Sequence, residues 1–462
     1  MKSKSFLLTA LMAILAFGNS FAQRFQVGEL EFEIISDEDK TVSLIGGDRS
    51  TIKELIIPET VSYNNEVYTV TTIKADFYHS ELIAVTIPNS VTSIKDFSMC
   101  MSLQFVNIGN SVETISNGAF MGSPAYFFVD PDNPYFSSEN GVLYNKDKTL
   151  LVSCQTADKD GAVNIPETVE KLAPQSFHSN LLLKQVTISP AVTEIGYNAF
   201  GDCTSLKTVL CLPAVPPGYL GLTDTGAWVS QLTCDVYVPD SSVEIYENEW
   251  GRSYQIFPMK YYPVTSIGYI DNIEYAILSE NDKSVAITDY EYRTGDSLEV
   301  PEQINYSGET YTVEMIGREA FLNCGKEEII LPSTINMISG YAFTRSSTLN
   351  KILLPAEEPP MLSPYAFWKS EVSSNHIPVT IYVPDSSVSH YKATNWGELN
   401  IKPISSYADS NNIETIREEL IFPVDVFSLD GRFIRSLKNK EEISNLKKGL
   451  YIIGGKKVIV NH

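Results

Sequence analysis

The chain repeats a phrase of about 23 residues, in which Leu-x-x-Val-x-Ile-Pro precedes Val-x-x-Ile, Ala-Phe and Cys. The clearest copy runs from Leu181 to Cys203. Because one such unit is too short to bury its own apolar face, several units must stack and share a core. The repeat therefore predicts a solenoid. Further copies occupy residues 82–100, 103–120, 163–177, 316–324 and 329–343.

Each copy reads as a short strand followed by turns. In the clearest copy, Val186 and Ile188 alternate with polar residues, which is typical of a half-buried strand. Pro190 follows the strand and ends it, because proline cannot donate to a sheet. Near the end of the unit, Ala199 permits close backbone approach while Phe200 fills the space between layers.

A known family shares these residues. Residues 87–94, Ile-Pro-Asn-Ser-Val-Thr-Ser-Ile, and the Ala-Phe-x-x-Cys of other copies resemble the BspA-type leucine-rich repeats of bacterial surface proteins. Residues 129–144 are similar to a second signature of that family, a hairpin inserted between coils. The resemblance extends over most of residues 28–404, although Ser123 stands where the repeat has Cys. It implies a β-dominated leucine-rich-repeat solenoid with a right-handed superhelix.

The sequence also contains a longer repeat, which includes several copies of the short one. Residues 32–42 match residues 275–285, and the offset of 243 persists through Tyr68 and Tyr311. Residues 236–243 and 381–388 also end alike, each being followed by Tyr and Trp. A terminal coil has one face without a neighbour, so these aromatic segments are expected caps. We predict two tandem blocks, residues 23–259 and the shorter 260–404, each closed by a cap.

The N-terminus has the composition of a cleavable export signal. Two lysines precede an apolar stretch from residue 6 to residue 17, and small residues lead to Ala22. We expect residues 1–22 to be removed by cleavage between Ala22 and Gln23. No later segment approaches the roughly 18 to 20 apolar residues of a membrane-spanning helix. The sequence predicts an exported protein, displayed at the cell surface or outer membrane or secreted.

The C-terminus predicts a small separate domain. Residues 405–420 are polar and read as a linker, and residues 421–462 alternate as the strands of an all-β domain do. Residues 424–432 and 446–458 resemble the sorting domains of type IX secretion substrates. That resemblance implies a delivery signal, and the alternative is a terminal β domain without a sorting role.

The net charge limits the kinds of partner that the chain can bind, and the motifs that it lacks argue against catalysis. With 57 acidic against 34 basic residues, the chain would repel nucleic-acid phosphates, so no nucleic-acid partner is expected. The five histidines form no metal-ligand spacing with cysteine, and no phosphate-binding or nucleophile motif occurs. We therefore expect no enzyme, no metal and no cofactor.

The six cysteines have two interpretations. Cys100, Cys203 and Cys324 occupy the coil-end position of the repeat, where they resemble small buried hydrophobic residues. The other three lie off that position, and one pair among them could be bridged, with Cys211 and Cys234 the better guess. The count is too low for a disulfide scaffold.

The strand pattern also predicts a binding surface. Residues that alternate with the core positions should point outward, and stacking would align them across one sheet into an extended interaction surface. Ordinary solvent-facing residues would show the same pattern. The predicted surface consists of Phe105, Asn107, Gln185, Thr187, Thr208, Leu210, Glu328, Ile330, Lys351 and Leu353.

Two classes of function remain from the sequence. The family resemblance implies a non-enzymatic surface or secreted protein that adheres to host or extracellular-matrix proteins. The alternative is a cell-envelope scaffold or a glycan-binding accessory protein. Either would take an extracellular protein or glycan as partner, and the oligomeric state is left open.

Overall fold

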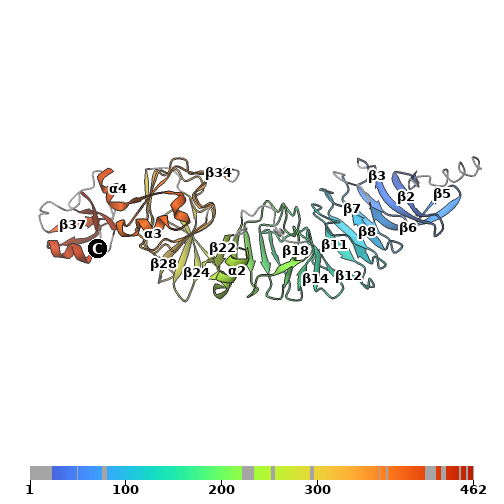
Figure 1. Cartoon of the computed structure of the whole chain (residues 1–462), viewed down its shortest axis with the longest axis horizontal. Helices are drawn as coiled ribbons and strands as arrows, with labels where there is room; N and C mark the ends of the chain where they lie inside the picture. The colour runs from blue at the N-terminus through green and yellow to red at the C-terminus, as the bar shows by residue number, and fades with distance from the viewer. Residues whose placement is uncertain are drawn as a thin grey trace, which may run out of the picture. The chain divides into compact units, whose positions relative to one another are not determined.

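The structure is a computed structural model that describes residues 23–48, 50–74, 77, 81–220, 234–250, 255–291, 296–363, 365–370, 373–410, 423–427, 433–446, 449–453 and 456–460. The predicted export signal up to Ala22 lies outside these residues. The chain divides into two compact units, Met1–Ile256 and Phe257–His462 (Figure 1).

The first unit is built from short strands of successive turns that lie side by side in four sheets (Figure 1). Sheet A contains β1 (Arg24–Val27), β2 (Leu30–Ser36), β3 (Thr41–Gly47), β6 (Glu66–Lys74), β8 (Ser93–Asp96) and β10 (Thr114–Ile115), with β5 (Thr60–Tyr63) paired to β6. Sheet B contains β4 (Glu54–Ile56), β7 (Ala84–Ile87), β9 (Phe105–Ile108) and β11 (Tyr126–Val129). Sheet C contains β12 (Phe136–Glu139), β13 (Val142–Asn145), β14 (Leu150–Ser153), β16 (Lys171–Leu172), β18 (Glu194–Gly196) and β20 (Gly218–Leu220). Sheet D contains β15 (Ala162–Asn164), β17 (Gln185–Ile188), β19 (Thr208–Cys211), β21 (Asp235–Val238) and β22 (Gln255–Pro258), and the helices η1 (Asp240–Ser242) and α2 (Val243–Trp250) follow β21.

The second unit repeats this plan once and adds a C-terminal sheet. Sheet E contains β23 (Thr265–Ile270), β24 (Ile273–Ser279), β25 (Ser284–Tyr290), β28 (Glu309–Ile316), β30 (Met337–Ile338) and β32 (Met361–Leu362), with β27 (Gln303–Tyr306) paired to β28. Sheet F contains β26 (Ser297–Glu299), β29 (Glu328–Ile330), β31 (Lys351–Leu353), β35 (Thr380–Val383) and β36 (Asn400–Pro403). A hairpin pairs β33 (Trp368–Ser370) with β34 (Ser373–His376), and the last sheet contains β37 (Val424–Phe427), β38 (Phe433–Leu437), β39 (Gly449–Ile453) and β40 (Lys456–Val460). The helical segments are η2 (Met259–Tyr261), η3 (Asp385–Ser387), α3 (Val388–Lys392), η4 (Asn395–Glu398), α4 (Ile404–Ser410) and η5 (Lys440–Asn445).

Successive turns pair in parallel and in register, which confirms the predicted solenoid. In sheet D, Gln185 pairs with Thr208 and Val186 with Val209, a shift of one repeat. Two such sheets enclose each core: sheets A and B share one hydrophobic cluster, C and D a second, and E and F a third. Since each turn pairs only with its neighbours, the same outward and inward positions recur from strand to strand.

The phenylalanines of the Ala-Phe phrase form ladders inside each core. The ring centroids of Phe97 and Phe120 lie 6.1 Å apart with parallel planes. Those of Phe177 and Phe200 lie 4.7 Å apart, and Phe343 stacks on Phe367 at 4.9 Å. Offset stacking at these distances adds about 1 kcal/mol per pair beyond the burial of apolar area. The ladders therefore tie neighbouring turns together as the repeat predicts.

In five repeats, the turn around this phenylalanine uses two left-handed residues four positions apart. In the clearest repeat these are Asn198 and Asp202, both at φ 53°. Asn, Asp and Gly adopt this region at little cost, which explains their frequency here. Tyr341 lies at φ 58° in the same position of a later repeat and is more strained. The equivalent pairs are Gly118 and Gly122, Gln175 and Ser179, Glu319 and Asn323, and Tyr341 and Arg345.

The coil-end residue hydrogen-bonds the preceding turn. The thiol of Cys203 donates to the Phe177 carbonyl at 3.0 Å. Where the repeat has serine, the Ser123 hydroxyl donates to the Phe97 carbonyl at 2.8 Å and accepts from the Cys100 amide at 3.0 Å. All six cysteines are buried thiols, so the bridge considered between Cys211 and Cys234 is not formed. Cys or Ser recurs at this position because either side chain can donate the hydrogen bond to the preceding turn. The recurrence does not reflect disulfide formation.

Twin aromatic segments close the core between sheets C and D and the core between sheets E and F. Tyr246 packs edge-on against Trp250 at 4.9 Å, and its hydroxyl donates to the Pro213 carbonyl at 2.8 Å. In the second unit Tyr391 packs edge-on against Trp396 at 5.4 Å, and its hydroxyl donates to the Ala356 carbonyl at 3.0 Å. All four rings are buried. They cover apolar area of the last turn that would otherwise be exposed to water.

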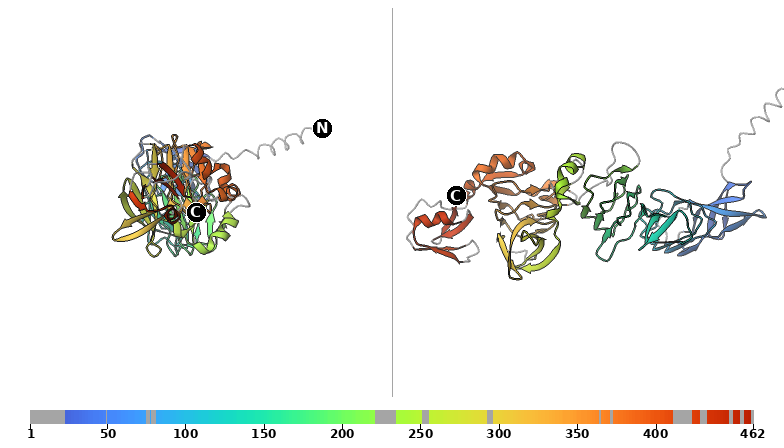
Figure 2. Two further views of the ribbon diagram at one scale, coloured as in Figure 1. Left: turned by 90° about the vertical axis from the view of Figure 1, so that its left-hand side faces the viewer. Right: turned by 90° about the horizontal axis from the view of Figure 1, so that it is seen from below.

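Helix α4 covers part of the outer face of sheet F. Its Ile404 and Tyr407 form a small buried cluster with Leu353 and Tyr382, against which Ile330 packs. The Tyr407 hydroxyl donates to the Glu328 carboxylate at 2.8 Å. Burial, followed by the charge of Glu328, raises the Tyr407 pKa above its usual value. In Figure 1 and in the right-hand view of Figure 2, the orange helical segments of the second unit lie beside its strands.

Replacing Ser123 tests the coil-end hydrogen bonds. Ser123→Ala leaves the buried Phe97 carbonyl and Cys100 amide without this partner, which should lower the free energy of unfolding by about 2 kcal/mol. Ser123→Cys should retain much of that stability, because a cysteine at the equivalent position of another repeat donates to the equivalent carbonyl. Chemical denaturation measures both. The control is Ser102→Ala at an exposed site, and equal stability of Ser123→Ala and the control would contradict the account.

Removing the Tyr407 ring tests the docking of α4. Tyr407→Ala should destabilise the second unit by about 3 kcal/mol, since it empties a buried site. Tyr407→Phe keeps the ring and loses only the bond to Glu328, so about 1 kcal/mol is expected. Denaturation followed by tryptophan fluorescence, with limited proteolysis after residue 404, gives both numbers. Protease resistance of α4 in Tyr407→Ala would show that the ring does not hold it.

Candidate functional site

The ten predicted surface residues lie on three separate sheets. Strand register aligns Gln185 with Thr208 and Thr187 with Leu210 on sheet D. On sheet F, Glu328 aligns with Lys351 and Ile330 with Leu353. Phe105 and Asn107 lie on β9 of sheet B. The structure thus brings the predicted residues together within each sheet but gives them different surroundings.

On sheet F the prediction of an open surface is wrong. Leu353 is only 2% exposed because α4 lies over it, and Ile330 packs against the same cluster. Glu328 accepts a hydrogen bond from Tyr407, and the Lys351 ammonium lies 5.7 Å from the centre of that ring. These side chains bind a helix of their own chain, so the face is already occupied.

On sheet D the prediction is wrong for one residue. Leu210 is 9% exposed and therefore buried, in register with Tyr237, which is also buried. Gln185, Thr187 and Thr208 are half-buried. Their polar side chains fit an ordinary sheet surface.

Sheet B keeps a wide apolar outer face. Phe105 is 44% exposed, and the register places Tyr126 beside it on β11. Phe128 is 48% exposed and follows Asn107 in the neighbouring row, which begins with the exposed Ile56 on β4. The centres of Tyr126 and Phe128 lie 5.2 Å apart, and those of Phe105 and Phe128 lie 6.5 Å apart. We call Phe105, Tyr126 and Phe128 the aromatic patch.

The surface predicted from the sequence included one member of this patch, Phe105, and missed two. Tyr126 and Phe128 lie 21 residues after Phe105 and Asn107, the same interval that separates Ile87 from Ile108. Extending the repeat by one such interval would have identified β11. The predicted hairpin of residues 129–144 begins just after these two residues, and in the structure the hairpin strands are β12 and β13.

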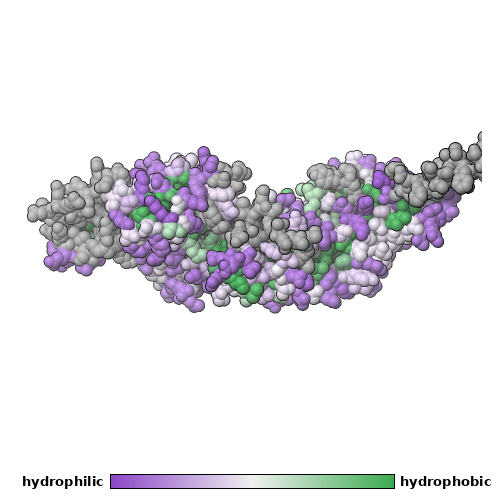
Figure 3. Space-filling view, in the orientation of Figure 1, coloured by the Kyte–Doolittle hydropathy of each residue, from purple (hydrophilic) through white to green (hydrophobic). Residues whose placement is uncertain are grey.

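Hydrophilic residues cover most of the described surface in the view of Figure 3, with smaller hydrophobic areas between them. Large apolar side chains such as Val215 and Val264 are exposed elsewhere on the chain. A contiguous cluster of exposed apolar side chains indicates an interaction site more strongly than a single one does. The aromatic patch is the candidate functional site.

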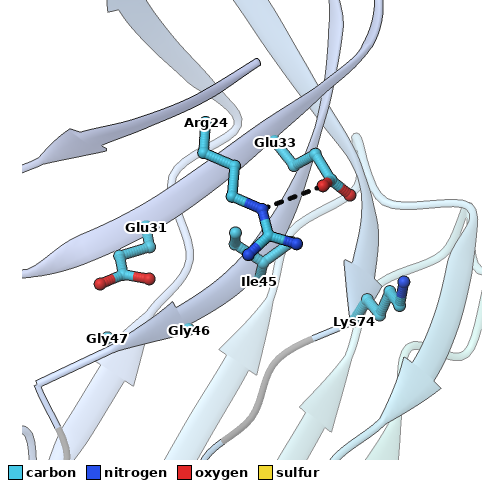
Figure 4. Close-up of a pocket in the computed structure, with 7 residues that line it drawn as sticks. All are labelled: Arg24, Glu31, Glu33, Ile45, Gly46, Gly47 and Lys74. Carbon is cyan, nitrogen blue, oxygen red and sulfur yellow. Dashed lines mark hydrogen bonds and ion pairs between the residues drawn. The ribbon is translucent and has the colours of Figure 1, made fainter. Parts of the chain in front are cut away.

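A polar pocket near the N-terminal hairpin is a weaker candidate. It has a volume of about 400 Å³ and is lined by Arg24, Glu31, Glu33, Ile45, Gly46, Gly47 and Lys74 (Figure 4). The Arg24 guanidinium reaches the Glu33 carboxylate at 3.1 Å. Two cationic and two anionic side chains line one opening, so their fields largely cancel and favour neither a cation nor an anion.

The reactive side chains show structural roles. Burial raises the pKa of Cys154 to about 12, which keeps its thiol protonated at neutral pH. His178 contacts the Ser179 hydroxyl at 2.8 Å, and burial lowers its pKa. Within the described residues, no three His, Cys, Asp or Glu side chains cluster closely enough to hold a metal ion. In the same part of the chain, no helix combines the length and apolar composition needed to cross a bilayer.

Solved structures with a similar arrangement include bacterial leucine-rich repeat proteins. A leucine-rich cell surface protein from Faecalibacterium prausnitzii A2-165 is 19% identical over 87% of this chain and 100% of that one, with a TM-score of 0.30. The pneumococcal vaccine antigen PcpA is 15% identical over 83% and 97%, with a TM-score of 0.26. A leucine-rich repeat protein from Bacteroides ovatus ATCC 8483 is 13% identical over 82% and 99%, also with a TM-score of 0.26. No curated protein matches the chain significantly.

A family model identifies the family to which the repeats belong. The model of the BspA type leucine rich repeat region matches six copies, in residues 70–127, 158–215 and 302–422, which together make up just over half of the chain. These segments include β7 and β9 of sheet B, β15, β17 and β19 of sheet D, and β29, β31, β35 and β36 of sheet F. The chain belongs to the BspA-type leucine-rich repeat family.

Proposed function

We propose that this chain is an exported, non-enzymatic binding protein that recognises an extracellular protein, as an adhesin for host or matrix proteins would. The observation that carries the proposal is the aromatic patch on sheet B, which remains exposed while the equivalent face of sheet F is covered. Regular strands hold the three side chains, so binding costs little ordering of the backbone. Exposed Phe and Tyr residues supply large contact area with few rotatable bonds.

The alternatives are a cell-envelope scaffold and a glycan-binding accessory protein. A scaffold would use its surface on other copies or on neighbouring envelope proteins. Glycan binding is favoured by one observation, the amide of Asn107, which donates to Thr86 at 3.4 Å beside the exposed rings. Amides and hydroxyls next to aromatic rings can hydrogen-bond sugar hydroxyls while the rings pack on the sugar face.

Delivery to the cell surface is a second part of the proposal. The predicted signal at residues 1–22 would direct export, and the β domain formed by β37–β40 would act as a sorting domain. Its strands enclose a small core of Val424, Val426, Leu437, Leu446 and Ile453, with Tyr451 packed on it. This core supports a separately folded domain, as a recognised C-terminal signal requires.

Removing two rings of the patch tests the binding function. Phe105→Ala with Phe128→Ala should reduce capture of matrix proteins by the purified chain at least about 10-fold, since each ring loses contact area worth about 1 to 2 kcal/mol. The melting temperature should stay unchanged because both rings are exposed. Surface plasmon resonance against immobilised matrix proteins and polysaccharides measures capture. Binding to polysaccharide alone would favour the glycan alternative, and equal capture by the variant would refute the site.

Deletion of residues 424–462 tests the delivery role. The truncated protein should keep its solenoid and be lost from the cell surface, accumulating inside the envelope. Cell fractionation and protease shaving measure the distribution. The control replaces the buried Val426 by Ala, which weakens the domain core without removing the segment. Unchanged surface display after the deletion would refute a sorting role and leave the binding function untouched.

A further inference from the structure

The aromatic patch has a geometry that limits what can bind. Neighbouring rings are inclined to one another, Tyr126 to Phe128 by 40° and Phe105 to Phe128 by 34°. Rings inclined in this way present no single flat platform for a sugar ring. They can contact a side chain that projects from a partner, either an aliphatic group or a cation that lies over a ring face.

The second unit shows what this kind of face accepts. On sheet F, α4 contacts the outer rows through Ile404 and Tyr407, which are three residues apart and so lie on one side of the helix. The contact combines apolar packing on Leu353 and Tyr382 with one polar bond, from the Tyr407 hydroxyl to Glu328. A Lys351 ammonium lies over the Tyr407 ring. A short helix with two apolar side chains at this spacing is therefore a demonstrated occupant of an outer face.

The charge around the aromatic patch determines which sign of charge a partner should carry. Between residues 50 and 140 the chain has ten acidic residues and three lysines. Glu54 is exposed and lies in the same cross-strand row as Phe105 and Tyr126. The whole chain has a net charge of −23. This field attracts cationic segments and repels acidic ones at moderate ionic strength.

We propose that the aromatic patch binds a helical segment of a partner protein that carries apolar side chains three or four residues apart, flanked by Lys or Arg. The apolar side chains would pack against the exposed rings of Phe105, Tyr126 and Phe128. A flanking cation would lie over a ring or near Glu54. The inference rests on the proposed protein-binding function and adds the chemistry of the partner.

Three designed peptides of about 16 residues test the proposal on the full chain. The first is helical, with Ile and Tyr three residues apart and four flanking arginines. The second replaces the arginines by glutamates, and the third breaks the helix with a central proline. Isothermal titration calorimetry should give measurable binding of the first, binding at least about 10-fold weaker for the other two, and weakening of the first between 50 and 300 mM salt.

The matched variants locate the site. Phe105→Ala with Phe128→Ala should weaken binding of the arginine peptide at least about 10-fold. The control pair Leu182→Ala and Tyr197→Ala removes side chains of similar exposure elsewhere on the first unit and should leave binding unchanged. Circular dichroism confirms that both variants are folded.

Several outcomes would overturn the inference. Equal binding of the glutamate or proline peptide refutes the basic or the helical requirement, and equal loss in the control pair refutes the site. Concentration-dependent self-association abolished by the patch variant would identify a second copy as the occupant instead. If the patch variant loses capture of matrix proteins while no peptide binds, the protein-binding function stands and this choice of partner is wrong.

Discussion

Pairing between neighbouring turns is the interaction on which everything else depends. A turn of 21 to 24 residues contributes only a few strand residues and one phenylalanine to the interior, too little for a core of its own. Three kinds of contact each act between adjacent turns: parallel registers such as Gln185 with Thr208, the ring ladder from Phe77 to Phe120, and the hydrogen bond from Cys203 to the preceding turn. Weakening one turn therefore weakens the contacts on both sides of it.

The same constraint builds the candidate binding surface. Because register is kept, each outward position of one strand is adjacent to the same position of the next, and side chains gather in rows across the sheet. On sheet B these rows bring Phe105 beside Tyr126 and Asn107 beside Phe128. On sheet F equivalent rows bind α4. One architecture thus yields an open face in one unit and an occupied face in the other.

Much of this was readable from the sequence. The alternation around Val186 predicted the strands, and Phe200 was expected to fill the space between layers, where it stacks on Phe177. The hydrogen bond of Ser123 was not predicted, because the sequence showed only that serine replaces cysteine at that position. The binding surface was predicted less well. Leu353 and Leu210 have the sequence pattern of outward residues and are nevertheless buried, while Phe128 was not identified.

The sequence by itself determined which residues alternate inward and outward, because that alternation is a local property of a strand with a period of two. Which outward residues remain exposed was decided only by the tertiary structure. The bond between Tyr407 and Glu328 joins residues 79 positions apart, and no local pattern around either residue announces it. Exposure depends on what packs against a face, and the partners of a face are set by long-range contacts that the repeat does not encode.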